Sequence, residues 1–328
     1  MTLVLTASHL EALLNMPATV AAVEGIFGDI GRGTAHQPAP AAMYLPSSDS
    51  NFVVMSGLAD GPGLAAVKLL SDIPSNSAAG LPTQRSTILL ADQQTGATLA
   101  ILDGRIPTRA RTAAASAVAS KYLAPAGSST LGLIGAGALA AAHLEAMLVV
   151  LPIDTVVVWS RTQATIERFR KAVAHLHVKV LAAGSVREVL ESSDVVCTLT
   201  PSVDPILKGE WLIPGLHVNA VGARPRTSHR EIDSLGMARS RVFVDSMATA
   251  VAKSGDLLLA VEEGAMALDD VAGELSDVVA GKQAGRASDT EITLFNSVGI
   301  GSLDLAIGRI LYDAALERGI GLKVNMAG

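Results

Sequence analysis

The stretch TLGLIGAGALA, residues 130–140, places a Gly-x-Gly-x-x-Ala pattern after a short apolar run and before an alanine-rich segment that continues to Val150. This order predicts a strand, a tight turn and a helix, the context in which the pattern binds a dinucleotide. Gly135 permits the turn, Gly137 lets the backbone approach a pyrophosphate, and Ala140 lets the helix pack against the strand. Ala138 and Leu139 begin the helix, so their N–H groups face the phosphates. The alternative is an ordinary strand-to-helix turn that is rich in glycine.

The residues that follow indicate which dinucleotide is bound. The apolar run 155–159 predicts the second strand of a βαβ unit. A site that prefers NAD usually has an acidic residue near the end of this strand, bonded to the ribose 2′-hydroxyl. Ser160, Arg161 and Thr162 stand there instead. Because a guanidinium pairs with a phosphate in a bidentate way, this triplet favours NADPH and leaves NADH as the second choice. The alternative is that Arg161 is a solvated residue opening a surface helix.

Composition bounds the class of protein. The chain has 328 residues, enough for two domains, and is 49% hydrophobic but only 3% aromatic. Such a core consists mainly of Ala, Val, Leu and Ile, which suits buried parallel strands. No apolar run reaches the roughly 18 residues of a membrane span, the N-terminus lacks a basic leader pattern, and Cys197 is the single cysteine. We therefore expect a cytoplasmic protein with no membrane partner. A net charge of −6 gives no basic surface for nucleic acid.

Residues 1–117 predict an α+β domain with a mostly antiparallel sheet. A helical pattern covers 8–27, with Ser8 as the N-cap and Glu11 at the capping-box position. Turns rich in Gly, Pro, Ser and Asn then separate short apolar pieces, and 92–96 is expected to be a hairpin turn. The strands are predicted at 52–55, 64–70, 87–90 and 97–102.

Residues 118–295 alternate strand and helix, as a parallel Rossmann sheet requires. Further strands are predicted at 178–181, 194–199, 217–221 and 242–245. An amphipathic helix lies within 292–322, its apolar face formed by Leu303, Ile307, Ile310, Leu311 and Ala314. Because the Rossmann unit is complete before this helix, 296–328 is expected to return to the first domain. The fold class is thus α/β: a Rossmann domain plus a discontinuous α+β domain made of 1–117 and 296–328.

The chain resembles the ornithine cyclodeaminase/μ-crystallin family over nearly its whole length. The resemblance is carried by eight runs: AVKL (66–69), TRARTAAAS (108–116), LIGAG (133–137), WSRT (159–162), PIL (205–207), PGLHVNAVGA (214–223), REID (230–233) and TLFNSVG (293–299). It implies a Rossmann domain and a second domain that forms a homodimer. It also implies hydride transfer between a nicotinamide and the α-carbon of a small amino or imino acid.

The resemblance assigns roles to two basic residues. Arg111 is implied to bind the substrate carboxylate or a cofactor phosphate, because a buried carboxylate must be paired and a guanidinium fork pairs it with fixed geometry. The alternative is a salt bridge on a helix surface. Lys68 lies in an apolar strand, so it either reaches solvent at an edge or faces a polar site. The family places a site lysine there, which orients the carboxylate or donates a proton. The implied cofactor contacts also include Thr112, Thr198, Leu199, Val221 and Ser297.

Two departures from the family pattern affect substrate binding. Relatives usually carry an arginine in the segment matching 40–46, but Ala42 stands there. Our hypothesis is that Arg85 replaces this lost cation. Cyclodeaminases and alanine dehydrogenases also tend to have an aspartate directly after the pair matching Gly222-Ala223, where it handles the substrate amino group. This chain has Arg224-Pro225-Arg226 and no acid at that place.

The missing aspartate favours reduction over ammonia elimination, which needs an acid or base on the leaving amine. The sequence therefore predicts an NAD(P)H-dependent reductase of a small imino acid, Δ1-pyrroline-2-carboxylate or Δ1-piperideine-2-carboxylate, giving L-proline or L-pipecolate. An ornithine cyclodeaminase or amino-acid dehydrogenase is the alternative if Ser228 or Glu231 takes the place of the acid. A non-catalytic NADPH-dependent binding protein is a third reading. The histidines show no ligand pattern, so no metal is expected.

Overall fold

The computed structural model describes residues 1–224 and 226–326, and Pro225 of the arginine-rich loop lies outside this range. The chain splits into two compact units, one made of Met1–Arg111 and Ile300–Gly328 and the other of Thr112–Gly299. The first division falls inside helix α3 (Arg105–Leu123). The protein has a parallel Rossmann-type sheet and a second, mixed sheet. This architecture confirms the predicted α/β fold class.

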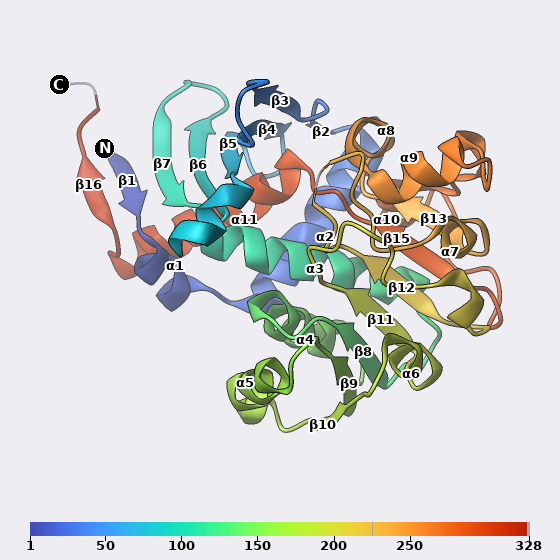
Figure 1. Cartoon of the computed structure of the whole chain (residues 1–328). Coiled ribbons are helices and arrows are strands. Elements are labelled where there is room, and N and C mark those ends of the chain that lie inside the picture. The colour runs from blue at the N-terminus through green and yellow to red at the C-terminus, as the bar shows by residue number, and fades with distance from the viewer. Residues whose placement is uncertain (225, 327–328) are drawn as a thin grey trace. The chain divides into compact units, whose positions relative to one another are not determined.

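The first unit is built on a mixed sheet in the order β16-β1-β7-β6-β5-β4-β2, with β3 also paired to β4. All of its pairings are antiparallel except that of β1 with β7, so the predicted mostly antiparallel sheet is confirmed. Figure 1 shows β7, β6, β5 and β4 following one another across this unit. Its strands are β1 (Thr2–Leu5), β2 (Ala35–His36), β3 (Ala41–Tyr44), β4 (Asn51–Ala59), β5 (Leu64–Asp72), β6 (Gln84–Asp92), β7 (Thr98–Asp103) and β16 (Leu322–Val324). Its helices besides α3 are α1 (Ala7–Leu13), α2 (Met16–Arg32), the 3₁₀ helix η1 (Pro74–Ala79) and α11 (Gly301–Arg318).

Alternation along the long strands gives this sheet two different faces. Leu64, Ala66 and Lys68 of β5 point to the buried face, which α11 covers, and α2 packs against α11. Val67 and Leu69 point the other way and are exposed. The hairpin turn between β6 and β7 forms where it is predicted, with the Asp92 N–H donating to the carbonyl of Ala97 at 2.9 Å.

The N-terminal helix differs from the prediction. The pattern over 8–27 is two helices, α1 and α2, with a break at Leu14 and Asn15. Thr6, not Ser8, caps α1, and its capping-box partner is His9, not Glu11. Asn15 caps α2 by accepting a hydrogen bond from the Ala18 N–H at 2.9 Å. The spacing of apolar residues continues through both helices without a break. The sequence pattern therefore does not reveal Asn15 as the cap of a second helix.

The second unit is an all-parallel sheet in the order β10-β9-β8-β11-β12-β15-β13-β14. The strands predicted at 178–181, 194–199, 217–221 and 242–245 are confirmed to within a few residues. Its strands are β8 (Thr130–Ile134), β9 (Thr155–Trp159), β10 (Lys179–Ala182), β11 (Val195–Thr198), β12 (His217–Ala220), β13 (Arg241–Val244), β14 (Gly273–Glu274) and β15 (Thr293–Asn296). Its helices are α4 (Ala138–Val150), α5 (Gln163–Val173), α6 (Val186–Glu191), α7 (Ser234–Ala238), α8 (Met247–Lys253), α9 (Gly255–Glu262), α10 (Leu275–Val279) and the 3₁₀ helices η2 (Ala174–Leu176), η3 (Gly209–Trp211) and η4 (Leu268–Asp270).

The segment after residue 291 completes the Rossmann sheet and corrects one expectation. Its strand β15 inserts between β12 and β13 and ends at Asn296, before helix α11 begins at Gly301. The helix that follows, α11, is not amphipathic in its first half, since residues 301–308 are all buried. Ile310 and Ala314 of the predicted apolar face are only half-buried, whereas Ala315 is buried. A helix end that is buried all round cannot show a one-sided pattern.

No single helix in the described part of the chain is both long and apolar enough to cross a membrane. Helices α1 and α2 pass this test only as a pair, and they are bent by 93° at their break.

Candidate functional site

The turn after β8 has the backbone that the glycine pattern predicts. Gly135 has a φ of +113°, and a Cβ on it would lie 2.8 Å from the carbonyl oxygen of Leu199. A residue with a side chain would be strained at this φ, and its Cβ would lie too close to that oxygen. Gly137 is the N-cap of α4, and a Cβ there would meet nothing within 4 Å. This open backbone leaves room for a ligand next to Ala138 and Leu139, whose N–H groups in the first helical turn have no intrahelical acceptor. Ala140 is fully buried, as close packing of the helix requires.

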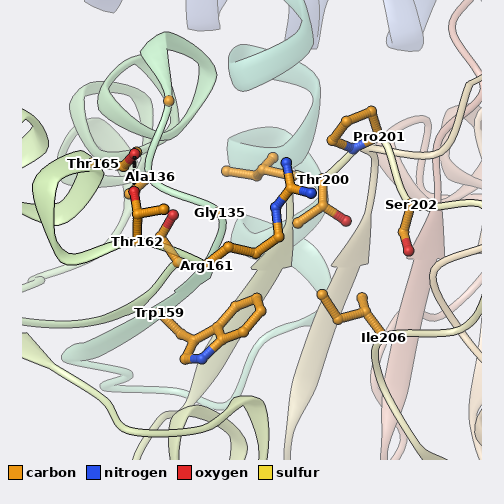
Figure 2. A pocket seen from close by; sticks show the side chains of 13 residues that line it. Gly135, Ala136, Trp159, Arg161, Thr162, Thr165, Thr200, Pro201, Ser202 and Ile206 are labelled. Atoms are coloured by element: carbon orange, nitrogen blue, oxygen red, sulfur yellow. Dashed lines mark hydrogen bonds between the residues drawn. The ribbon is translucent and has the colours of Figure 1, made fainter.

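A pocket of about 340 Å³ opens at this turn. It lies at the carboxyl ends of β8, β9 and β11, where the chain order of the sheet reverses between β8 and β11. Ligands of open α/β sheets bind at such a point. Figure 2 shows three groups of lining residues converging on it. They are 135–137 from the turn, 159–162 with Thr165 from the end of β9, and 199–202 with Ile206 after β11.

Ser160, Arg161 and Thr162 line the side of the pocket that follows β9. Arg161 is exposed, and Figure 2 shows its side chain extending toward the loop that carries Thr200. Among the residues that the structure describes, Arg161 is in no ion pair. The Thr162 hydroxyl lies 2.8 Å from that of Thr165. This side of the pocket thus presents a guanidinium and hydroxyl groups, with no carboxylate among its lining residues.

The ends of β11 and β12 are tied together by Glu231, which is fully buried. The Thr198 hydroxyl and the Gly222 N–H donate to Oε2, each at 2.7 Å. The Thr200 N–H donates to Oε1 at 2.7 Å and the Thr200 hydroxyl at 2.6 Å. Burial raises the pKa of Glu231 to about 7, against these hydrogen bonds, which lower it. Glu231 therefore holds the wall of the pocket and is no free acid in the loop after β12. Ser228 of that loop is exposed.

The other predicted cofactor residues lie in the second unit but do not line the pocket described above. Thr198 ends β11, and Val221 follows β12 with its N–H donating to the Thr198 carbonyl at 3.3 Å. The Ser297 hydroxyl donates to Asp245 at 3.1 Å. Thr112 is half-buried on α3.

The first unit contains a buried ionic cluster of Lys68, Asp304 and Arg111. The Lys68 ammonium lies 2.7 Å from Oδ2 of Asp304, and Nε of Arg111 donates to Oδ1 of Asp304 at 3.2 Å. The exposed fractions of the three side chains are 1%, 1% and 6%. With one carboxylate between two cations, the cluster carries one positive charge in excess.

Close packing of α11 on β4 brings Asp304 to this cluster. A Cβ on Gly57 would lie 3.0 Å from the backbone of Ser302, and one on Gly301 would lie 2.3 Å from the carbonyl oxygen of Ser56. The two glycines therefore let the first turn of α11 sit directly on the sheet, with Asp304 beside β5. Burial and, to a lesser degree, the charge of Arg111 lower the pKa of Lys68, Asp304 raises it, and the net value is about 8.

The structure does not bring Arg85 to the cluster. Arg85 pairs with Ser71 across β5 and β6, whereas Lys68 pairs with Ile88. Residues an odd number apart along a strand point to opposite faces. Arg85 is accordingly exposed on the face that also carries Val67 and Leu69, and Ile88 is buried with Lys68. The hypothesis that Arg85 replaces the missing family cation is therefore corrected. Arg109 is also outside the cluster, 3.9 Å from Glu11 and 30% exposed.

Sequence reasoning misses two features of the site, the role of Asp304 in the cluster and the role of Glu231 in the pocket wall. Asp304 had a recognisable signal, since it is the one charged residue in the apolar run from Ile300 to Ile307. An unpaired carboxylate is not buried in such a run, and Asp304 therefore required a basic partner. Glu231 had no comparable signal, because its partners are backbone groups and hydroxyls of distant loops.

Comparison with known proteins agrees with this geometry. The model of the ornithine cyclodeaminase/mu-crystallin family matches residues 1–319. Alanine dehydrogenase of Archaeoglobus fulgidus is 34% identical over 326 residues, covering 99% of this chain and 98% of that protein. Δ1-pyrroline-2-carboxylate reductase of Thermococcus litoralis, in complex with NADH and L-proline, superposes with a TM-score of 0.93 and 34% identity, covering 98% of this chain and all of that one. An archaeal alanine dehydrogenase dimer with bound NAD has a TM-score of 0.93 and 31% identity, covering 99% of both chains.

The chain belongs to the ornithine cyclodeaminase/mu-crystallin family. With its dinucleotide pocket, it is an NAD(P)-dependent oxidoreductase of that family. A reductase and a dehydrogenase are equally similar to it, at 34% identity each, so identity alone does not choose the substrate.

Proposed function

We propose that this protein reduces a small cyclic imino acid, Δ1-pyrroline-2-carboxylate or Δ1-piperideine-2-carboxylate, to L-proline or L-pipecolate. The observation that carries the proposal is the excess positive charge of the buried cluster formed by Lys68, Asp304 and Arg111. A buried charge is costly unless an ion of opposite sign pairs with it. One carboxylate neutralises the cluster, and the substrate supplies it.

Each basic residue of the cluster has donors for that carboxylate. Lys68 has three N–H donors, and Asp304 is the only carboxylate within ion-pair distance of it among the described residues. Arg111 donates to Asp304 through Nε, which leaves the two terminal nitrogens of its fork for a bidentate contact. Asp304 thereby orients both cations before the substrate arrives, and this preorganisation lowers the entropy cost of binding.

The fit of the second unit to a dinucleotide rests on the open backbone at Gly137 and the pocket beside it. Gly135, Gly137 and the first turn of α4 would hold the pyrophosphate, and Ser160, Arg161 and Thr162 the adenosine ribose. Thr112, Thr198, Leu199, Val221 and Ser297 remain proposed cofactor contacts. A bound reduced nicotinamide supplies the hydride that a C=N bond needs for reduction.

Reduction is favoured over deamination by the state of the acids near the loop after β12. Glu231 is buried and accepts four hydrogen bonds, so it is not available to a substrate amine. An imine nitrogen can enter already protonated, and its reduction therefore does not require the missing aspartate. Lys68, with a pKa of about 8, would donate a proton only to a substrate whose imine nitrogen enters neutral; with a protonated imine it stays charged and holds the carboxylate.

The test of substrate class is a comparison of initial rates. NADPH oxidation with each cyclic imino acid is measured against NADPH oxidation with pyruvate plus ammonia. Higher kcat/KM with a cyclic imino acid supports the proposal. Higher kcat/KM with pyruvate and ammonia would make the protein an alanine dehydrogenase, the activity named for the Archaeoglobus relative.

We further propose that the cofactor is NADPH. Replacing Arg161 with alanine is expected to raise KM for NADPH about 10- to 100-fold, because a charge-assisted contact to the 2′-phosphate is lost. KM for NADH, which lacks that phosphate, stays within about threefold. Arg187, exposed on α6 and paired with Glu191 at 2.7 Å, is the matched control. An equal rise in both KM values in the Arg161 variant would contradict the assignment.

A homodimer is proposed through the uncovered face of the mixed sheet. Five exposed apolar side chains lie on β4, β5 and β6: Phe52, Leu58, Val67, Leu69 and Leu89. The register places all five on one face of the sheet, an exposed apolar face of this kind is typical of an interface, and the archaeal alanine dehydrogenase is a dimer. The double substitution Val67→Glu with Leu69→Glu is expected to give a monomer of 33.6 kDa in light scattering where the wild type has twice that mass. Leu316→Glu, at an exposed position on α11, is the control and is expected to leave the dimer intact. A dimer in the double variant would refute this face as the interface.

A further inference from the structure

Glu231 is one of the buried carboxyl groups that the proposed reaction does not use. Each of its two oxygens accepts one hydrogen bond from a hydroxyl and one from a backbone N–H. Oε1 accepts from the hydroxyl and the N–H of Thr200, and Oε2 accepts from the Thr198 hydroxyl and the Gly222 N–H. All four distances are 2.6 or 2.7 Å.

These donors come from two adjacent strand ends. β11 and β12 are paired in parallel, with Thr198 opposite Ala220. The chains that leave them stay in contact, since a Cβ on Gly222 would lie 2.3 Å from the Thr200 nitrogen. Thr200 lines the dinucleotide pocket, and the Leu199 carbonyl before it lies against the glycine turn at Gly135. Glu231 thus fixes one wall of the pocket from behind.

Glu231 is itself held in place by a second buried carboxylate. The N–H groups of Glu231 and Ile232 both donate to Oδ1 of Asp256, at 2.8 and 2.9 Å. Asn296, at the end of β15, donates to Oδ2 of Asp256 at 3.1 Å. The main chain at Glu231 is therefore anchored to the sheet. It does not depend on the two loops that the Glu231 carboxylate holds.

We infer that Glu231 is a positioning residue for the cofactor: it sets the Leu199–Thr200 wall against the glycine turn so that the pocket is preformed. This inference rests on the dinucleotide pocket and not on the identity of the imino acid. A cofactor-binding measurement therefore tests it even if the proposed substrate is wrong.

An amide at this position cannot accept hydrogen bonds from all four donors. In a Glu231→Gln variant, one of the two oxygens becomes an NH₂ group in either orientation of the side chain. That group then faces a backbone N–H, of Thr200 or of Gly222, and two donors cannot bond to each other. A hydroxyl can turn to accept, but a backbone N–H cannot, so one of the two loops is released.

The experiment measures the Kd of the complex between the full-length protein and NADPH, followed by the fluorescence of the reduced nicotinamide. Glu231→Gln is expected to raise the Kd for NADPH at least about tenfold, because a buried backbone donor loses its partner and the wall is no longer preformed. Thr200→Val, which removes one hydroxyl and keeps the backbone bond, is expected to raise it about threefold. The graded pair keeps the inference testable if the first variant does not fold.

Asp194→Ala is the matched control for a purely structural effect. Asp194 accepts two backbone hydrogen bonds, from Ser129 and Thr130, each at 2.9 Å, at the opposite end of β8. Its loss is expected to lower Tm without changing Kd. Hydrogen exchange gives a second readout, in which the Thr200 and Gly222 amides exchange faster in Glu231→Gln than in the Asp194 variant. An unchanged Kd in both Glu231→Gln and Thr200→Val, or equal effects in the Asp194 control, would overturn the inference.

Discussion

Replacing Arg111 with alanine is expected to lower kcat/KM for the cyclic imino acid about 100- to 1,000-fold, the usual cost of truncating one member of a buried charged contact. The Lys68–Asp304 pair that remains is neutral, so the cluster loses its excess charge and its attraction for a carboxylate. Because Lys68 still pairs with Asp304, no buried carboxylate is left alone, and the variant should fold. The measurement is steady-state kinetics together with the Kd for NADPH, which should stay within about threefold of wild type.

Arg109→Ala is the control for this result. It removes the same charge from the same helix, two residues away, where the side chain is 30% exposed and 3.9 Å from Glu11. Its kcat/KM should be close to that of the wild type. A similar loss in both variants would show that the general charge of α3 matters, and that the buried cluster does not select the substrate.

The second large effect is a dependence of KM on pH. Burial lowers the pKa of Lys68 to about 8, and the nearby Arg111 acts in the same direction, while Asp304 raises it. Lys68 is therefore charged below pH 8 and neutral above it. KM for the imino acid should rise about tenfold per pH unit above about 8, because only the charged form binds the carboxylate. These two residues are the charged groups that act on Lys68 in the part of the chain described by the structure.

Lys68→Arg separates this effect from titration of the substrate. A guanidinium stays charged throughout the accessible pH range. The variant's KM should therefore change less with pH than that of the wild type, whatever the absolute value. An identical rise of KM above pH 8 in both proteins would assign the titration to the imino acid or to another group.

The sequence was most informative where function depends on the backbone. The pattern at Gly135 and Gly137 predicted a turn whose φ value and close contacts only glycine accepts, and the pocket forms there. Arg161 lines the same pocket because it directly follows the second strand, which is a local property, and its role in cofactor binding stays a prediction. Local signals of this kind survive folding because the neighbouring residues along the chain determine them.

Residues that act across the fold were harder to predict. Asp304 meets Arg111 across a sequence separation of 193, and only the packing of α11 on the sheet joins them. The prediction for Arg85 is wrong for a simpler reason: the sequence does not show the register of the strand that carries Arg85 against the strand that carries Lys68. The register of β5 against β6 sends Arg85 to the face opposite Lys68. A one-residue shift would have sent it to the same face.

The central claim is tested most directly by following the hydride into the product. The protein is incubated with Δ1-pyrroline-2-carboxylate and NADPH that carries deuterium at the transferable position of the nicotinamide, and the product is analysed by mass spectrometry and chiral chromatography. We predict L-proline with one deuterium at the α-carbon, formed in equal amount to the NADPH consumed. No labelled proline, together with ammonia release from ornithine or with NADH formation from L-alanine and NAD⁺, would contradict the account.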